Sequence, residues 1–377
     1  MDKKEFSQEE LDNIKKALKG WENVTLEQVQ VTAGWGLCNY TYIVKALDSQ
    51  VSPPAVFYRV FRDIQGAKDR DRENKIFKAI AEKGLGPQCH GATLEYRIEE
   101  YIPSHVVGVK ELHTPQISRQ IAKWQAGLHK QNFDFLGLDK KATKMLNLIE
   151  GGDFIKRAKE VLHTMEFNEE DQKVVDLLKT KVTEEEWNSL KEMLPKGEKA
   201  IRFCHNDPNI GNIIIVEATG KPMLVDYENA GYDYRGLDIG AFMALSRVNL
   251  VHPEPPYIHV DYSKFSTDED MRGYIRRYLL FFRHDWNTID EEKAFVDDEY
   301  LKEYIIKNDN LEDFEEEVEQ ILRETYVGVM LNQMFATLMV ITMDIKGLPY
   351  SKYLMTEASY KIYMEFKEKA KASPLRE

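Results

Sequence analysis

The stretch that decides the fold runs from residue 201 to residue 240 and reads IRFCHNDPNIGNIIIVEATGKPMLVDYENAGYDYRGLDIG. Its apolar runs IRFC, IIIV and MLV have the length and composition of short strands, and a polar loop separates the first two. The last two runs are joined by the turn residues ATGK and form a hairpin. Because a hairpin returns the chain to its starting edge, we expect Asn212 and Asp226 at the same end of the sheet, beside Asp207.

Phosphoryl transfer from a nucleotide requires this set of groups. One carboxylate orients the attacking hydroxyl and accepts its proton, while a carboxylate and an amide oxygen hold the Mg²⁺ that bridges the phosphates. The pattern HxDxxxxN alone has an ordinary turn composition, but an Asp at a strand end fourteen residues after Asn212 favours a kinase-like site. We expect His205 to be structural. Asp238 is either a helix cap or a carboxylate that organises the loop, and the second role is favoured.

Composition excludes several classes of protein. The 377 residues are 43% hydrophobic and 11% aromatic, which is enough for a packed core and argues against disorder. Lys and Arg number 51 against 64 Asp and Glu, a net charge of −13, and no segregated basic patch is visible, so nucleic-acid binding is not expected. Cys38, Cys89 and Cys204 are too few and too scattered for a disulfide framework or a zinc site, which indicates a reducing compartment.

The sequence also predicts where the protein resides. The N-terminus, MDKKEFSQEELD, is charged and has no apolar region, so no secretory signal is expected. Residues 327–343 are the best membrane candidate, but they are shorter than the about 20 residues that a bilayer span needs, and Asn332 and Gln333 interrupt them. A buried core helix without a membrane span is expected, in a cytoplasmic globular protein.

The order of expected elements predicts an α+β protein with a small antiparallel-sheet lobe followed by a larger, mainly helical lobe. These elements are a helix with a capping box at Ser7 and Glu10, three antiparallel strands within 26–61, a helix over 69–83, a strand over 94–102, a helix starting at Thr114 and a long helix over 169–196. A cleft between two lobes is the default ligand site.

At this point a family resemblance becomes visible. FCHNDPNIGNIII, MLVDYENAGYDYRGLDIG and the upstream EEYIPS resemble the choline/ethanolamine kinase family, as do FYRVF and ENKIFKAIAEKGLGP. The resemblance covers most of the chain. It implies a bilobal protein-kinase-like fold, with a nucleotide-binding lobe over 1–102 and a catalytic and substrate lobe over 103–377. It also implies ATP- and Mg²⁺-dependent phosphorylation of the hydroxyl of choline, ethanolamine or both, and it leaves a homodimer open.

The resemblance implies a role for each matching residue. Asp207 would be the catalytic base, and Asn212 and Asp226 would be the Mg²⁺ ligands. Arg59 would contact the nucleotide phosphates, with Glu73 as its partner, and the phosphate loop would contain Gly34, Gly36 and Asn39. Backbone groups of Glu100 and Ile102, which flank Tyr101, would contact the adenine.

Two of these roles can be weighed from the residues themselves. The glycines of AGWGLCNY would let backbone N–H groups approach a phosphate, but a plain hairpin turn explains them equally well. An arginine within the apolar strand FYRVF is unfavourable unless its charge meets a partner or a ligand, which favours a function for Arg59. Glu73 is a plausible partner, and a charged helix face explains it as well.

The substrate side departs from the family pattern. A quaternary ammonium is best held by aromatic faces and a carboxylate, but several positions of that cage differ here: Asn229, Ala241, Leu245, Phe335 and Leu338. Aromatic side chains that could replace the cage, although each is individually more typical of core packing, are Tyr257, Tyr262, Trp286, Tyr350, Tyr353 and Tyr360. Two alternatives therefore remain: a kinase of another small hydroxyl compound, similar to aminoglycoside phosphotransferases, or an ATP-binding protein without turnover. The HND triplet and YDYRGLDIG favour the choline/ethanolamine branch.

Overall fold

The computed structural model describes residues 5–34, 39–62, 67–140, 143–249, 254–343 and 351–375. The chain forms two compact units. Unit 1 comprises Met1–His105 and Ile214–Glu228, and unit 2 comprises Val106–Ile213 and Asn229–Glu377. The functional division at residue 102 stays a prediction, because a compact unit does not by itself have a role.

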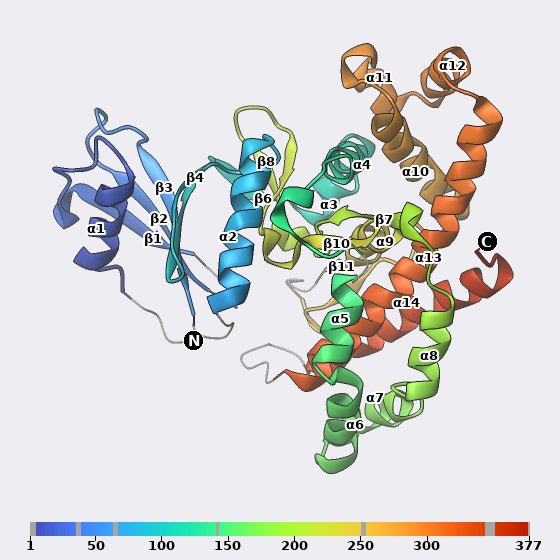
Figure 1. Ribbon diagram of the computed structural model, residues 1–377. Helices are drawn as coiled ribbons and strands as arrows, with labels where there is room; N and C mark the ends of the chain where they lie inside the picture. The colour runs from blue at the N-terminus through green and yellow to red at the C-terminus, as the bar shows by residue number, and fades with distance from the viewer. Residues whose placement is uncertain are drawn as a thin grey trace. The chain divides into compact units, whose positions relative to one another are not determined.

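Unit 1 is built mainly of strands (Figure 1). Its elements are α1 (Gln8–Ala17), β1 (Val29–Ala33), β2 (Asn39–Ala46), β3 (Ala55–Phe61), α2 (Ala67–Glu82), β4 (Cys89–Ala92), β5 (Tyr96–Glu100), β6 (Ser104–Val106), β8 (Ile213–Val216) and β9 (Pro222–Leu224), with β6 and β8 running across the unit boundaries. The first five strands form one sheet in the order β1-β2-β3-β5-β4, in which all neighbours are antiparallel. The expected three antiparallel strands are confirmed.

The two faces of this sheet differ in chemistry because side chains alternate along a strand. One face packs against α1, which begins with the expected capping box between Ser7 and Glu10. The apolar core on that side comprises Leu11, Ile14, Leu18, Trp21, Val24, Tyr42, Val44, Val51, Val56, Tyr58 and Ile98. The other face carries Arg59 and Arg97, and α2 lies on that side, opposite α1 (Figure 1).

Strand β4 was not expected from the sequence. Its residues, CHGA, include no β-branched or aromatic side chain, and its register against β5 shifts between Cys89 and Gly91. A short edge strand of this kind forms because the backbone of β5 has an unpaired edge to which it can add. The amino-acid composition of the segment gives no sign of that edge.

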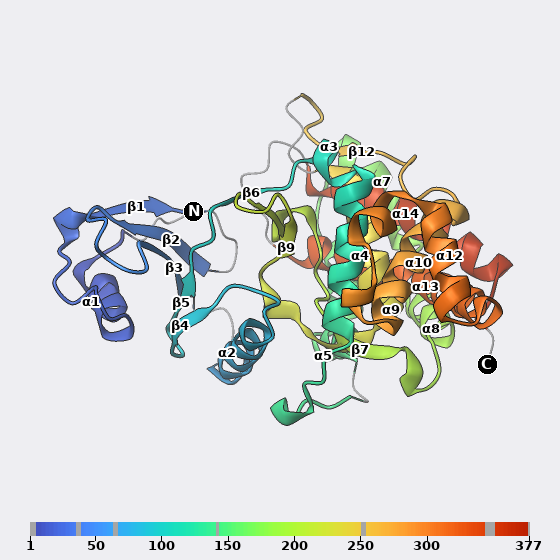
Figure 2. The same cartoon turned by 90° about the horizontal axis from the view of Figure 1, so that it is seen from above.

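Unit 2 is mainly helical (Figure 2). Its elements are α3 (Val109–Leu112), α4 (Pro115–His129), α5 (Lys144–Gly151), α6 (Phe154–Thr164), α7 (Glu169–Lys179), α8 (Glu184–Glu192), β7 (Ile201–Cys204), β10 (Gly231–Tyr234), α9 (Arg235–Leu245), β11 (Val248–Asn249), β12 (His259–Val260), α10 (Asp268–Arg283), α11 (Glu291–Val296), α12 (Asp298–Asn308), α13 (Leu311–Thr342) and α14 (Lys352–Ala372). Together with unit 1, this confirms the α+β class.

One expected helix is wrong. Residues 169–196 do not form a single helix but two, α7 and α8, separated by a short break. The hydroxyl of Thr183 accepts a hydrogen bond from the N–H of Glu186 at 3.1 Å and so begins a new helix. The threonine hydroxyl thus accepts a backbone hydrogen bond at the start of α8, and an N-cap of this kind favours the beginning of a new helix over the continuation of the preceding one.

Helix α13 is the centre of unit 2 and packs against α9, α10 and α14 (Figure 2). By length and composition it could cross a membrane, but 78% of its most apolar window is buried inside the structure. It approaches α9 very closely, since a Cβ added at Gly328 would lie 2.0 Å from the carbonyl oxygen of Gly236. Residues 327–343 therefore contribute to the core of this unit.

Candidate active site

The loop between β7 and β8 holds Asp207 in a defined orientation. Its Oδ1 accepts a hydrogen bond from Asn209 Nδ2 at 2.8 Å, and its Oδ2 accepts one from Asn212 Nδ2 at 3.2 Å. The same amide nitrogen donates to the backbone oxygen of Asp207 at 3.0 Å. Asp207 and Asn212 thus lie together, and Asn209, which sequence reasoning did not single out, completes the arrangement.

Asp238, near the start of α9, anchors this loop through hydrogen bonds. Its Oδ1 accepts the backbone N–H of Asn206 at 2.8 Å, and its backbone oxygen accepts from Gln125 Nε2 at 2.9 Å. Asn206 has a φ of 66°, a left-handed conformation that is strained for a residue other than glycine. The carboxylate helps to hold that conformation, so the expected organising role of Asp238 is confirmed.

The preceding residue, His205, is structural in the way that was expected. It is fully buried, and its Nδ1 accepts the backbone N–H of Asp207 at 3.3 Å. Its ring also makes an edge contact with Trp124, with centroids 6.2 Å apart. These contacts fix the backbone immediately before the candidate base.

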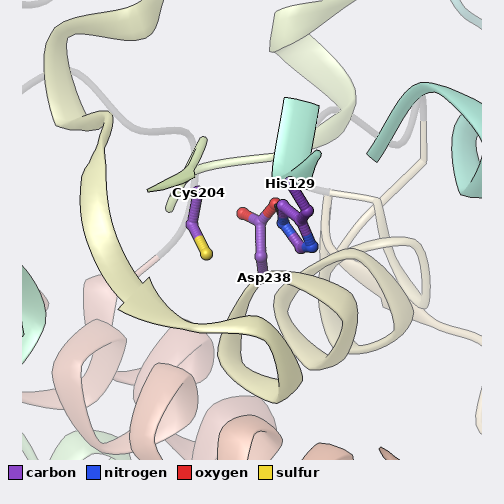
Figure 3. Close-up of side chains that lie close together, drawn as sticks. All are labelled: His129, Cys204 and Asp238. Carbon is purple, nitrogen blue, oxygen red and sulfur yellow. Dashed lines mark hydrogen bonds and ion pairs between the residues drawn. The ribbon is translucent and has the colours of Figure 1, made fainter. Parts of the chain in front are cut away.

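His129, Cys204 and Asp238 form a buried cluster whose potential ligand atoms lie within 4.8 Å of one another (Figure 3). Burial opposes the charge of Asp238, yet the hydrogen bond from His129 lowers the pKa of its carboxyl. For His129, burial lowers the pKa, which favours the neutral imidazole. In that form, Nε2 donates to the Asp238 carboxylate at 3.0 Å, and Nδ1 accepts from the Tyr278 hydroxyl. Burial raises the pKa of Cys204 well above its ordinary value. His129 and Asp238 are thus joined by a hydrogen bond that supports the loop, while the Cys204 thiol donates to backbone oxygens such as that of Asp233 at 3.6 Å.

In unit 1, Asp226 follows β9 and lies against Arg59. It has a φ of 67°, again in the left-handed region, and its Oδ1 accepts from Arg59 Nη1 at 3.3 Å. Strained residues of this kind are concentrated at functional sites. Arg59 is buried within β3, and its Nε donates to Glu99 Oε1 at 3.1 Å. Burial opposes its charge, but Asp226 and Glu99 raise the pKa of the guanidinium above its ordinary value.

The expected partnership of Arg59 with Glu73 is wrong as a direct ion pair. Glu73, on α2, instead accepts from Arg97 Nη1 at 2.8 Å. Arg97 lies directly opposite Arg59 in the β3–β5 register and points to the same face of the sheet. Glu73 pairs with Arg97 because α2 places the carboxylate of Glu73 beside β5, which carries Arg97, and not beside β3, which carries Arg59. An arginine in the strand YRIEE was a readable signal, by the same burial reasoning that singled out Arg59.

The other residues of the expected nucleotide site have specific local roles. Gly34 donates its N–H to the Thr41 oxygen at 2.7 Å, and a Cβ there would lie 2.3 Å from the Thr41 hydroxyl. The hairpin itself therefore requires Gly34. Asn39 is the first residue of β2, and Gly36 lies outside the described residues.

The segment expected at the adenine begins at the last residue of β5. The N–H of Glu100 donates to the Gln88 oxygen at 2.8 Å, and the oxygen of Ile102 accepts from the Ser104 hydroxyl at 2.8 Å. Between them, the ring of Tyr101 lies 5.0 Å from the Lys45 ammonium. These contacts hold the segment in place, and its role toward adenine stays a prediction.

Comparison with known proteins decides the family. A family model described as choline/ethanolamine kinase matches residues 30–372 of the 377 in the chain. The chain belongs to the choline/ethanolamine kinase family. It is therefore an enzyme of choline/ethanolamine kinase type.

Individual members of the family agree with this assignment. The choline/ethanolamine kinase of Homo sapiens is 29% identical over 294 residues, which cover 75% of this chain and 71% of that protein. Choline kinase alpha of Mus musculus is 30% identical over 241 residues, which cover 62% of this chain and 51% of that protein.

Solved structures show the fold. A choline kinase from Cryptosporidium parvum Iowa II has a TM-score of 0.69 and 18% identity, and the match covers 96% of this chain and 95% of that one. An ethanolamine kinase from Plasmodium vivax has a TM-score of 0.60 and 16% identity, with 93% and 89% covered. These likenesses confirm the protein-kinase-like fold of the choline/ethanolamine kinase family.

The positions at which this chain departs from the family pattern lie in unit 2. Ala241 and Leu338 are fully buried in α9 and α13, so both belong to the helical core. Phe335 is half-buried and makes an edge contact with Phe154, with centroids 6.1 Å apart. The backbone oxygen of Asn229 accepts from Asn206 Nδ2 at 3.1 Å. The fifth position, Leu245, is half-buried at the end of α9.

Two of the aromatic side chains suggested as replacements have aromatic or cationic partners within the protein. Tyr353 is buried and meets Phe167 edge-on at 5.3 Å between centroids. The ring of Trp286 lies 4.5 Å from the Lys123 ammonium, while Tyr262 is exposed. Tyr257 has a left-handed φ of 63°, Tyr360 is half-buried, and Tyr350 lies outside the described residues.

The residues expected to hold a metal fit Mg²⁺ by their chemistry. Asp226 offers carboxylate oxygens and Asn212 an amide oxygen, and Mg²⁺ prefers hard oxygen ligands. The amide nitrogen of Asn212 is the atom that faces Asp207, so the oxygen is the atom available to a cation. The donor set contains no sulfur or imidazole that would favour zinc or a softer metal.

Proposed function

We propose that this protein transfers the γ-phosphoryl group of ATP, with Mg²⁺, to the hydroxyl of choline, ethanolamine or both, giving ADP and a phosphomonoester. The observation that carries the proposal is the orientation of Asp207, whose two carboxylate oxygens accept from Asn209 and Asn212. A carboxylate held in this way is ready to accept a hydrogen bond from an alcohol. Membership of the choline/ethanolamine kinase family supports the substrate class.

Each polar residue has a defined task in the proposed reaction. Asp207 orients the substrate hydroxyl and accepts its proton as the oxygen attacks the phosphorus. Asn212 and Asp226 hold the metal, and Arg59 places positive charge near the phosphates. Bound Mg²⁺ supplies neutralisation of the charge on the transferring phosphoryl group.

The nucleotide contacts and the setting of the protein complete the proposal. Residues 1–102 form the nucleotide-binding lobe and 103–377 the catalytic and substrate lobe. Gly34, Gly36 and Asn39 approach the phosphates, and Glu100 and Ile102 meet the adenine beside Tyr101. The protein acts in the cytoplasm on small molecules, without a nucleic-acid partner, and a homodimer remains open.

The proposal is tested by ADP release from purified protein with Mg²⁺ and ATP. The acceptors are choline, ethanolamine, their N-methylated intermediates and an aminoglycoside. We expect turnover of at least one amino alcohol, and a loss of about 10³-fold or more in kcat for Asp207→Ala, because the base is removed. Asp176→Ala is the control, since that carboxylate is 62% exposed on α7 and should leave kcat unchanged.

The alternatives predict other outcomes of the same assay. Turnover of the aminoglycoside alone would replace the substrate class, and the departures at Leu245 and Phe335 would then mark a different acceptor pocket. Binding of ATP without turnover of any acceptor would support the ATP-binding protein without catalysis. Absence of both binding and turnover would contradict the proposed function altogether.

A further inference from the structure

Five charged side chains of unit 1 form one buried network. Arg59 and Arg97 stand directly opposite each other on β3 and β5, and both are buried. Glu99 lies between them, because its Oε1 accepts from Arg59 Nε at 3.1 Å and from Arg97 Nε at 2.9 Å. Glu73 binds the far side of Arg97 at 2.8 Å, and Asp226 binds Arg59 at 3.3 Å. Like charges directly opposite in a sheet are unfavourable, so the two arginines depend on this shared carboxylate.

The two arginines differ in how firmly they are held. The Arg97 side chain is 1% exposed, and its guanidinium lies 4.0 Å from the centroid of the Phe77 ring. It also donates to Glu73 and Glu99, so carboxylates and an aromatic ring surround it. The only partner in this network that is appreciably exposed is Asp226, at 29%. The network thus runs from a closed end at Arg97, through the buried Arg59, to a partly exposed end at Asp226.

We infer that Arg97 is a positioning residue for Arg59. Arg97 fixes the carboxylate of Glu99, and this carboxylate orients the guanidinium of Arg59. Arg97 also binds Glu73, and this ion pair keeps the carboxylate of Glu73 away from Arg59. The inference rests on the proposed function, in which Arg59 contacts the ATP phosphates. Arg97 does not touch the nucleotide in this account. Its planar fork matters because two different nitrogens, Nη1 and Nε, donate to Glu73 and Glu99, whereas a lysine would offer a single flexible ammonium nitrogen in their place.

The test is a double-mutant cycle on nucleotide binding, measured by calorimetry with Mg²⁺ and ATP but without an acceptor alcohol. The variants are Arg59→Gln, Arg97→Lys and the two combined. We expect Arg97→Lys alone to raise the Kd about three- to tenfold, the range of one ordinary hydrogen bond, because the charge of residue 97 is kept and only its geometry changes. In the Arg59→Gln background the same change should raise the Kd less than twofold, since its effect passes through Arg59.

Two further variants keep the inference testable. Arg272→Lys is the matched control, because Arg272 lies on α10 of unit 2 and donates to the carboxylate of Glu319, which is not a member of the network. If Arg97→Lys fails to fold, Glu73→Gln replaces it in the same cycle, since the amide keeps the shape and weakens the hold on Arg97 through a side chain that accepts from Arg97. Turnover of choline or ethanolamine by Arg97→Lys should show a raised KM for ATP and a nearly unchanged KM for the alcohol.

The outcomes separate the inference from the proposed function. Equal effects of Arg97→Lys in both backgrounds would show a merely structural role and overturn the inference, as would an unchanged Kd in the single variant. In either case, ATP binding and turnover by the parent protein would leave the proposed function standing. A parent protein that does not bind Mg²⁺ and ATP would overturn both.

Discussion

Buried carboxylates of this protein differ in charge because their partners differ. Asp238 receives hydrogen bonds from His129 and from the N–H of Asn206, which together outweigh burial and lower its pKa. Burial raises the pKa of Asp233 to about 7, although the N–H groups of Met145 and Tyr234 donate to its carboxylate. At the residue scale, therefore, the carboxylate of Asp238, which anchors the Asp207 loop, is kept ionised, while Asp233 on β10 releases its proton only with a pKa of about 7.

This difference predicts how stability depends on pH. Between pH 4 and 7 the folded protein keeps the proton of Asp233 and the unfolded chain releases it, so the free energy of unfolding falls as pH rises. Asp233→Asn cannot titrate, so the parent protein should lose up to about 1.4 kcal/mol per pH unit relative to this variant in that window. Urea unfolding at pH 5, 6, 7 and 8 measures the difference. A constant difference across this range would contradict the prediction.

At the scale of elements, the contact between α9 and α13 depends on glycine. A Cβ at Gly328 would lie 2.0 Å from the oxygen and 2.3 Å from the carbonyl carbon of Gly236, and backbone cannot yield as a flexible side chain does. We expect Gly328→Ala to lower the free energy of unfolding by about 3 kcal/mol, as overpacking does. Denaturant unfolding measures it.

A second glycine provides the control for this prediction. At Gly273, in α10, the nearest atom to an added Cβ is the end of the Arg277 side chain at 3.8 Å. Gly273→Ala should therefore be neutral or stabilise by up to about 1 kcal/mol, because alanine is the better helix former. Equal destabilisation by both substitutions would show that close helix contact is not the cause.

At the scale of the whole molecule, the net charge of −13 opposes the binding of another polyanion. In the proposed function, binding of ATP therefore depends on a local positive charge, which Arg59 and Mg²⁺ would supply. We expect ATP at about 100 times its Kd to stabilise the protein by about 2.7 kcal/mol in the presence of Mg²⁺. Removal of Mg²⁺ with EDTA should abolish most of this effect. Thermal unfolding with the four combinations of ATP and Mg²⁺ measures it, and equal stabilisation without the metal would count against the expected ligands.

Much of the fold and part of the candidate site could be read from the chain. The capping box at Ser7, the first three strands and the loop around Asp207 were all expected, because each depends on residues close together in sequence. The proximity of Asp207 and Asn212 has the same origin, since five positions of one loop separate them. Their order before Asp226 was enough to indicate a kinase.

Tertiary structure alone decided the partners of the buried charges. Glu73 could bind Arg59 or Arg97, and the choice depends on how α2 is rotated over the sheet and on the register that sets Arg97 opposite Arg59. It likewise decided that β4 adds to the edge of β5. Spacing along the chain governs contacts within a loop, a turn or a hairpin. The partner of a charge that is buried between distant elements depends on which groups lie near it in the folded protein. Burial removes the charge from water at a large cost in free energy, and only a carboxylate in direct contact attracts it strongly enough to offset that cost.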